Sequence, residues 1–174
     1  EKRGVKEVIL CGINLADYKF KLKTQNSKCK TTTKNLKLFN LKSLLEKILK
    51  ETKIPRIRFG SINFRAFDDE FISLLSYPRL CPHFHIPLQS GCNLTLARMG
   101  RGYTFEEFKQ VVDKIRRSSP LVNITTDIIV GFPGETEEEF KESLKNLKSL
   151  EGIVSKIHVF RYSKREGTRA CLLY

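Results

Sequence analysis

The five cysteines of this 174-residue sequence lack the spacing of any common metal or redox motif. Cys11, Cys29, Cys81, Cys92 and Cys171 form neither a CxxC nor a CxxxCxxC pattern, and their odd number argues against a disulfide framework. No apolar run approaches the length of a membrane span, and no apolar stretch of signal-peptide type follows residues 1–4. We therefore expect a cytoplasmic protein without membrane insertion.

The composition is that of a globular protein with a basic surface. The chain is 40% hydrophobic and 10% aromatic, and its length suffices for one domain with a core. Lys+Arg 32 against Asp+Glu 19 gives a net charge of +13. Such a charge attracts polyanions, which favours nucleic acid as a partner. An ordinary lysine-rich surface explains the same surplus, so composition leaves both interpretations open.

Short apolar runs alternate with amphipathic stretches along the chain. Strands are predicted at residues 8–11, 56–59, 84–86, 124–130 and 157–160, the first of them buried and with Cys11 in the core. Helices are predicted at residues 41–49, 67–75, shortly after Gly91, from residue 105 and from residue 137. Thr104 with Glu107, and Thr136 with Glu139, form capping boxes for the last two helices. The basic residues 19–35 are predicted to form a loop.

Five buried strands that alternate with helices indicate the α/β class with a parallel sheet. Five units are too few for a closed eight-stranded barrel, so we expect an open or partial (β/α) barrel. In such sheets ligands bind beyond the carboxyl ends of the strands. Small and polar residues follow every predicted strand here, which is typical of a ligand-binding rim.

Two segments at the predicted strand ends could bind a ligand. Residues 131–136, Gly-Phe-Pro-Gly-Glu-Thr, join a strand to a helix, but the carboxylates at residues 137–139 would repel a phosphate. An adenine or a sulfonium remains possible there, and so does a capped turn without a ligand. Gln89 and Ser90 could contact a ribose. His83 and His85 share one strand face, and one of them is interpreted as a packed polar residue rather than a metal ligand. Cys81 lies two residues before His83, but no metal site is predicted there or elsewhere in the chain.

Two groups of basic residues stand near the same ends. Arg98 and Arg101 could grip a carboxylate or phosphate, or simply be solvated. Arg161, Lys164 and Arg165 surround Tyr162, and basic residues beside an aromatic ring can bind RNA through phosphate contacts and stacking. A solvated basic tail is the alternative.

Several of these segments together resemble the methylthiotransferase branch of the radical S-adenosylmethionine enzymes. The matching stretches occur in family order and read EVILCGINLADY, RIRFGSIN, CPHFHIPLQSGCNLTLARMGRGYTFEEF, ITTDIIVGFPGETEEEF and KIHVFRYSKREGT. The CGIN turn and the HVFRYSKREGT ending look most like the enzymes that act on N6-threonylcarbamoyladenosine in tRNA.

The resemblance implies a partial six-stranded (β/α) barrel of radical S-adenosylmethionine type. It implies S-adenosyl-L-methionine as cofactor, together with a 4Fe–4S cluster held by a CxxxCxxC loop after the first strand, and an electron donor that reduces the cluster. Reductive cleavage of the cofactor would yield a deoxyadenosyl radical. The resemblance further implies a second cluster in an N-terminal domain, a C-terminal RNA-binding barrel and tRNA as the partner.

The resemblance also suggests binding residues by position, without assigning a catalytic one. The residues that match family strand ends or turns, and are expected to line the cofactor cleft, are Asn14, Ser61, Gln89, Ser90, Arg101, Gly131 and Glu135. Arg161, Lys164 and Arg165 are the residues expected to contact substrate RNA.

The sequence departs from the family pattern in three places. It begins at what looks like the second strand, so residues 1–174 are interpreted as a core domain that is incomplete on its N-terminal side, without the cluster domain and the RNA-binding barrel. Arg161 and Arg169 stand where the family usually has proline, and residues 19–35 are long and basic for a loop.

A 4Fe–4S cluster of this type needs three thiolates in one motif, and the chain lacks them, so the chain alone is expected to be inactive. Activity is expected to belong to a longer tRNA methylthiotransferase of which this chain is a part. A non-catalytic basic RNA-binding fragment is the alternative, and an unrelated barrel enzyme fits less well, because Glu135 is the only carboxylate at the predicted rim. The sequence leaves the oligomeric state open.

Overall fold

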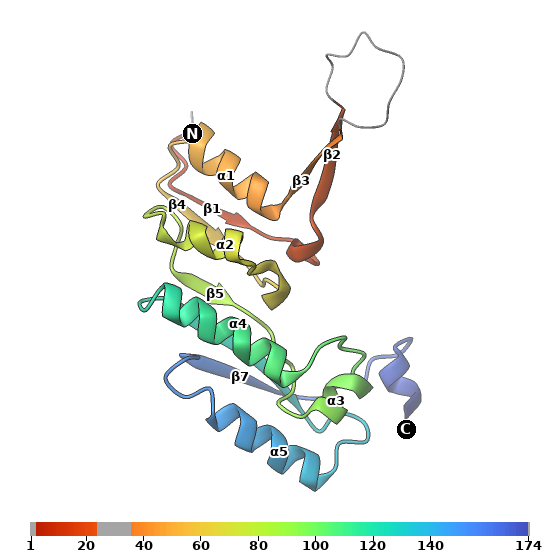
Figure 1. Cartoon of the computed structure of the whole chain (residues 1–174). Coiled ribbons are helices and arrows are strands. Elements are labelled where there is room, and N and C mark those ends of the chain that lie inside the picture. The colour runs from red at the N-terminus through yellow and green to blue at the C-terminus, as the bar shows by residue number, and fades with distance from the viewer. Residues whose placement is uncertain (1–2, 24–35, 174) are drawn as a thin grey trace. The chain divides into compact units, whose positions relative to one another are not determined.

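The computed structural model describes residues 3–23 and 36–173. These residues belong to two compact units, one within Glu1–Cys81 and one within Pro82–Tyr174. Figure 1 shows the elements of both units along the chain.

The first unit contains a parallel pair of strands, β1 (Glu7–Leu10) and β4 (Arg56–Phe59). The register places Leu10 opposite Phe59. Residues 79–81 lie beside β4 and are bonded to it through the hydrogen bond from the Cys81 N–H to the Ile57 carbonyl. The prediction that the first strand is buried was wrong, because Ile9 is 53% exposed and Cys11 is exposed. Among the described strands of this unit, β1 pairs only with β4 and is an edge strand.

Residues 19–23 form a strand rather than the predicted loop. Strand β2 (Lys19–Lys23) pairs antiparallel with β3 (Leu36–Asn40). The sequence of β2 alternates lysine with phenylalanine and leucine, which is the period-two pattern of a strand. The remainder of the predicted loop, with its three threonines, lies outside the described residues.

Helix α1 (Leu41–Glu51) confirms the first predicted helix. The Asn40 side chain accepts a hydrogen bond from the Ser43 N–H at its start, and the buried residues of its apolar face are Leu41, Leu45 and Leu49. At its end, the Arg79 guanidinium donates to the carbonyls of Leu49, Thr52 and Ile54. Carbonyls at a helix C-terminus have no partner within the helix, so Arg79 satisfies groups that would otherwise cost free energy.

The remaining helices of this unit are short. Helix α2 (Asp69–Ser73) follows Asp68, whose carboxylate accepts from the Phe71 N–H. Among the described residues of both units, the 3-10 helices are η1 (Leu15–Asp17), η2 (Phe64–Ala66), η3 (Leu74–Ser76) and η4 (Arg169–Leu173).

The second unit is built on three parallel strands in the order β5 (His83–His85), β6 (Asn123–Val130) and β7 (Lys156–Arg161). Helices α3 (Asn93–Arg98) and α4 (Phe105–Ser118) connect β5 to β6, and α5 (Glu137–Lys148) connects β6 to β7. Figure 1 shows α4 and α5 running alongside the sheet. The fully buried residues of this unit include Phe84, Leu96, Phe108, Ile115, Ile124 and Ile128, each of which contributes about 1.5–3 kcal/mol by burial.

Both predicted capping boxes are present. The Thr104 hydroxyl accepts from the Glu107 N–H while the Glu107 carboxylate accepts from the Thr104 N–H, and Thr136 and Glu139 repeat the arrangement. The buried residues of α5 are polar ones, Glu139 and Ser143.

The predicted α/β class with parallel strands is confirmed. All five predicted strands exist within a few residues of their expected bounds, and each described pairing among them is parallel. Among the described residues, no helix combines the length and the apolar character that crossing a membrane requires.

Candidate functional site

The two predicted cofactor residues of the first unit follow neighbouring strand ends. Asn14 comes after β1 and Ser61 after β4, and these strands end side by side because the Gly60 N–H donates to the Leu10 carbonyl at 2.9 Å. Both side chains are exposed. The Asn14 amide donates to the Asp17 carboxylate, which orients it within its own turn. The first unit thus brings Asn14 and Ser61 to one edge, as predicted for carboxyl ends of parallel strands.

Gln89 has an unusual backbone in the second unit. Its φ is +80°, and among the described residues other than glycine it is the only one with positive φ. Its N–H donates to the Asp127 carbonyl at 2.8 Å, and its own carbonyl accepts from the Ile129 N–H at 2.9 Å. These two bonds hold a conformation that costs about 1 kcal/mol or more for a residue with a side chain. Strain of this kind clusters at ligand-binding sites, so Gln89 is the strongest candidate for a ligand-binding residue at this edge of the sheet.

Ser90 and Gly91 are packed into the second unit. Ser90 is fully buried, and its hydroxyl accepts from the Cys92 N–H. Gly91 lies against α5, since a Cβ at this position would stand 2.6 Å from the Ser143 carbonyl oxygen. The Gly91 N–H donates to the Ser143 hydroxyl, and its carbonyl accepts from the Asn146 amide. In this structure the turn serves packing, and the expected contact of Ser90 with a cofactor stays a prediction.

The turn after β6 closes on itself. Gly131 has a φ of +69°, and its N–H donates to the Glu135 carboxylate. The Glu135 N–H in turn donates to the Phe132 carbonyl at 2.8 Å. Nothing lies within 4 Å of a Cβ placed on Gly131, so the space beside that backbone is open. The Glu135 carboxylate is thereby engaged within the turn, while Gly131 keeps room for a neighbour.

Arg98, the last residue of α3, and Arg101, which follows this helix, have different surroundings. Arg101 is exposed, and only its backbone N–H has a described bond, to the Leu96 carbonyl. Arg98 instead forms a two-point ion pair with Glu139, with distances of 2.9 and 2.7 Å between nitrogen and oxygen. Arg98 Nε would lie 3.1 Å from a Cβ on Gly134, so the guanidinium covers the turn after β6. Arg98 is therefore a structural residue, and Arg101 has a charged side chain on the surface.

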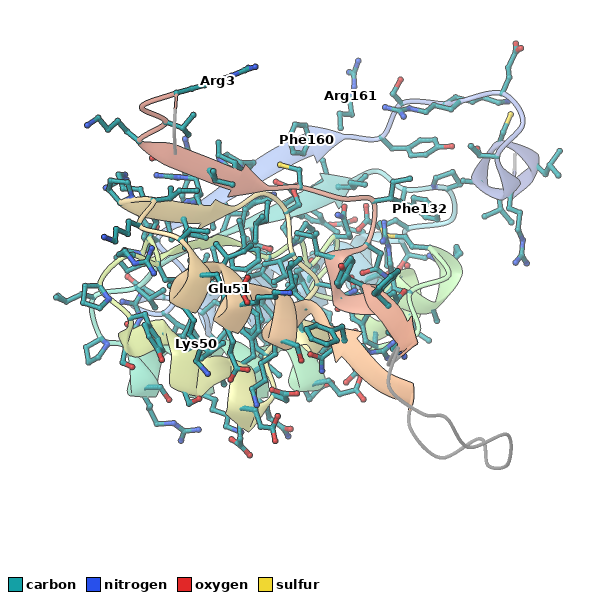
Figure 2. The ribbon with its side chains drawn as sticks, turned by 90° about the horizontal axis from the view of Figure 1, so that it is seen from above. Arg3, Lys50, Glu51, Phe132, Phe160 and Arg161 are labelled. Atoms are coloured by element: carbon teal, nitrogen blue, oxygen red, sulfur yellow. The ribbon has the colours of Figure 1, made fainter. Side chains whose placement is uncertain are left out.

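Exposed cations stand at the end of β7 and just after it. Arg161, Lys164 and Arg165 are all exposed, and Figure 2 shows Arg161 pointing away from the end of β7. The ring of Tyr162 meets that of Phe132 edge to face at 5.3 Å between centroids. The Tyr162 hydroxyl is buried and lacks a hydrogen-bond partner among the described residues. Buried hydroxyls nearly always have a partner, so this end of β7 fits the approach of a further polar group.

One face of the second unit's sheet borders a cavity of about 760 Å³. Because side chains alternate along a strand, every second residue of β5 and β7, and of β6 as far as Asp127, faces it. The lining residues include His83, His85, Asn123, Thr125, Asp127 and His158. The sheet is therefore polar on one side, while the residues between them, such as Phe84 and Ile124, are buried.

Three titratable side chains converge at the centre of that cavity wall. Asp127 Oδ2 lies 2.9 Å from His85 Nε2, and Asp127 Oδ1 lies 3.2 Å from His158 Nδ1. The register places Asp127 directly opposite His158 on β7 and two residues beyond Thr125, the partner of His85 on β5. Thr125 Oγ1 lies 2.9 Å from His85 Nδ1. We call His85, Asp127 and His158 the imidazole–carboxylate cluster.

The sequence pattern held a signal for this cluster. Asp127 is a lone carboxylate inside an otherwise β-branched strand, and His158 is a lone imidazole inside the last strand. Asp127 stands between the buried residues Thr126 and Ile128, which indicates a polar face, but the pairing of Asp127 with His158 depends on strand register. Cys81 and His83, the residues weighed above for a zinc site, are not in the cluster, and Cys81 belongs to the other unit.

Comparison with known proteins agrees with this fold. The family model described as "Radical SAM superfamily" matches residues 1–147. Coproporphyrinogen III oxidase of Escherichia coli, described as a radical SAM enzyme, has a similar structure with a TM-score of 0.57 at 19% identity, over 76% of this chain and 31% of that one.

Two curated relatives match nearly the whole chain. The threonylcarbamoyladenosine tRNA methylthiotransferase MtaB of Thermotoga maritima is 41% identical over 97% of this chain and 35% of its own length. The tRNA-2-methylthio-N(6)-dimethylallyladenosine synthase of Natranaerobius thermophilus is also 41% identical, over 97% of this chain and 34% of its own length. The chain thus spans about a third of the length of the curated relatives it matches. The family model covers far more than half of the chain, and with the parallel α/β fold it establishes that this chain belongs to the radical SAM superfamily.

Proposed function

We propose that the chain is the core part of a tRNA methylthiotransferase, which inserts a methylthio group at C2 of N6-threonylcarbamoyladenosine in tRNA. The observation that carries the proposal is the match over 97% of the chain, at 41% identity, to an enzyme named for that reaction. The matched region includes every strand end discussed above. An incomplete core domain, with the cluster domain and the RNA-binding barrel supplied by the rest of a longer protein, is part of the proposal.

The choice between nucleosides has separate support. Relatives named for dimethylallyladenosine reach the same 41% identity, so identity favours neither substrate. The CGIN turn at residues 11–14 and the ending at residues 158–168 resemble the threonylcarbamoyladenosine branch. These two segments are the basis for the narrower proposal.

The superfamily's usual cofactors are S-adenosyl-L-methionine and a 4Fe–4S cluster, which together supply a deoxyadenosyl radical. The described residues do not fit the cluster, because the free cysteines Cys11, Cys81, Cys92 and Cys171 are not gathered into any set of three metal ligands. Its ligands and the contact with an electron donor would belong to other parts of the protein. The proposal includes a cytoplasmic location, because that is the compartment in which the enzyme would encounter tRNA.

The described residues fit S-adenosyl-L-methionine better. Gln89 has a strained backbone at the carboxyl end of β5, and the backbone beside Gly131 is open. We propose that Gln89, Gly131 and Arg101 of the second unit bind the cofactor. For Asn14 and Ser61, at the strand ends of the first unit, cofactor binding stays a prediction from the resemblance. Ser90 and Glu135 would act by shaping their turns, since each is hydrogen-bonded within its own segment.

Nucleoside analysis of tRNA tests the proposal. The full gene that encodes this chain would be expressed in a bacterial host that lacks its own methylthiotransferases, and hydrolysed tRNA would be analysed by mass spectrometry. We expect 2-methylthio-N6-threonylcarbamoyladenosine to appear. Appearance of the dimethylallyladenosine product instead would overturn the narrower proposal, and absence of both products would overturn the proposed function.

A further inference from the structure

The imidazole–carboxylate cluster has no part in the proposed function, and it has the composition of a metal centre. His85, Asp127 and His158 each offer one ligand atom, and these three atoms all lie within 4.8 Å of one another. We propose that the cluster is a binding site for a transition-metal ion of the zinc class. This inference is independent of the substrate and the cofactor proposed above.

The distances suit a metal ion with small adjustments. Zinc binds nitrogen and oxygen ligands at about 2.0–2.2 Å, so ligand atoms in a tetrahedral site stand about 3.3 Å apart. Asp127 Oδ2 lies 2.9 Å from His85 Nε2 and Asp127 Oδ1 lies 3.2 Å from His158 Nδ1, and with one ligand atom taken from each residue the three atoms lie within 4.8 Å of one another, so side-chain adjustments would bring them to that spacing. The ligands come from three adjacent strands of one sheet, whose backbone hydrogen bonds hold their spacing. A site built on strands is preorganised, because little ordering is left for the ion to impose.

The surroundings of His85 match those of a ligand. If His85 coordinates through Nε2, its Nδ1 carries the proton and can donate to the Thr125 hydroxyl, which lies 2.9 Å away. Metal-bound histidines usually donate their second N–H to such a partner, which sets the tautomer and the ring orientation. Thr125 is therefore the orienting residue of the proposed site.

Charge also favours a cation. The described ion pairs of Asp127 are with the two imidazoles, and Lys156 is the only ammonium among the cavity-lining residues. With both imidazoles neutral the three ligands carry one negative charge, which a divalent ion would neutralise. Burying a carboxylate costs free energy unless a cation neutralises it, and the Asp127 side chain is only 22% exposed.

The ligand set selects the class of ion. Two imidazoles and one carboxylate suit zinc, cobalt, nickel or ferrous iron, whereas magnesium and calcium prefer oxygen ligands alone. Three protein ligands leave a fourth position open for water or another ligand. The cavity of about 760 Å³ has room for it, and His158 is 36% exposed beside that space.

The same atoms could instead form a hydrogen-bonded cluster without an ion, and metal titration separates the two. The purified 174-residue chain, freed of metal with a chelator, would be titrated with Co²⁺ by visible absorption and with Zn²⁺ by calorimetry near neutral pH. We expect one bound ion per chain, with the absorption of a nitrogen and oxygen site and no thiolate-to-metal band. Lack of binding, or a thiolate band, would overturn the proposal.

Variants locate the ion. We expect Asp127→Asn, His85→Gln and His158→Gln each to weaken binding about tenfold or more, and Thr125→Val by about tenfold. His83→Gln is the matched control, since His83 lies on the same strand and lines the same cavity outside the cluster. Circular dichroism of each metal-free variant would establish that it folds. Wild-type affinity in folded Asp127→Asn and His158→Gln would place the ion elsewhere and refute the site.

Discussion

Arg98 and Glu139 join α3 to the start of α5 through two hydrogen bonds, from Nη1 to Oε2 at 2.9 Å and from Nη2 to Oε1 at 2.7 Å. Oε2 also accepts from the Thr95 hydroxyl at 3.1 Å and the Thr136 N–H at 3.3 Å. Glu139 is thus a buried carboxylate that is part of a capping box and an ion pair at once. This pairing supports the turn after β6, where Gly134 lies under Arg98.

Replacing Glu139 tests the importance of this pair for stability. We expect Glu139→Gln to lower the free energy of unfolding by about 2 kcal/mol, because the Arg98 guanidinium loses a charged acceptor in a partly buried place. Urea denaturation would measure it. Glu138→Gln, one residue earlier and exposed, is the control and should change stability little. Equal effects of the two variants would contradict the assignment.

The same carboxyl predicts a dependence of stability on pH. Hydrogen bonding from Arg98 is the main cause that lowers the pKa of Glu139 to about 2, against the opposing effect of burial. A lowered pKa stabilises the folded chain above the unfolded value of 4.5, and this contribution disappears as the pH falls toward about 2. Denaturation curves across that range should show a smaller acid-induced loss for Glu139→Gln than for the wild type. An identical acid-induced loss in both proteins would show that Glu139 is not responsible.

The contact between the turn after β5 and α5 predicts a sensitive glycine. A Cβ at Gly91 would stand 2.6 Å from the Ser143 carbonyl oxygen and 3.0 Å from its Cα. Both are backbone atoms, so we expect Gly91→Ala to destabilise the fold by about 2 kcal/mol. Gly102→Ala is the matched control, since nothing lies within 4 Å of its Cβ position. Thermal unfolding of the two variants would compare them, and a control as unstable as Gly91→Ala would refute the packing argument.

The exposed cationic side chains at the end of β7 predict that tRNA binding depends on salt concentration. Replacing Arg161, Lys164 and Arg165 together by alanine should weaken binding and reduce the salt slope of log K by about 2 to 3, one counterion or slightly less for each lost phosphate contact. Filter binding at several salt concentrations would measure this. The control replaces the exposed lysines of α5, Lys141, Lys145 and Lys148, by alanine, with the same change in charge. An equal effect of the control would indicate attraction by net charge alone.

The spacing of the cysteines predicts that the 174-residue chain holds no 4Fe–4S cluster by itself. A site-differentiated cubane needs three thiolates in a suitable loop, and no CxxxCxxC motif occurs in the sequence. Anaerobic reconstitution with iron and sulfide, followed by absorption and iron analysis, should leave the chain without a cluster. A stoichiometric cubane on this chain would overturn the expectation.

Much of the second unit was predictable because its signals are local. The capping boxes at Thr104 and Thr136 depend on side chains three residues apart, and both exist as predicted. The failures lie in the first unit. The basic character of residues 19–23 predicts a loop, but they alternate like a strand and form β2. The apolar run at residues 8–11 predicts a buried strand, but β1 is an edge strand among the described residues.

The candidate binding residues divide in the same way. The sequence predicts that polar residues follow each strand. Asn14 and Ser61 share one edge of the first unit's strands, and Gln89 and Gly131 share one edge of the second unit's sheet. That Ser90 is packed inside, and that Glu135 bonds to its own turn, could not be read, because both depend on how α5 and the turn after β6 pack.

By itself the sequence determined the α/β class, the parallel strands and the polar strand ends, because each follows from neighbours a few residues apart. Only the tertiary structure decided the pairing of Arg98 with Glu139, the positive φ of Gln89 and the meeting of His85, Asp127 and His158. Arg98 and Glu139 are 41 residues apart in the sequence, and His85, Asp127 and His158 lie on three separate strands. The meeting of His85, Asp127 and His158 depends on the register of their strands, since a shift of one strand by one residue would turn its side chains to the other face of the sheet.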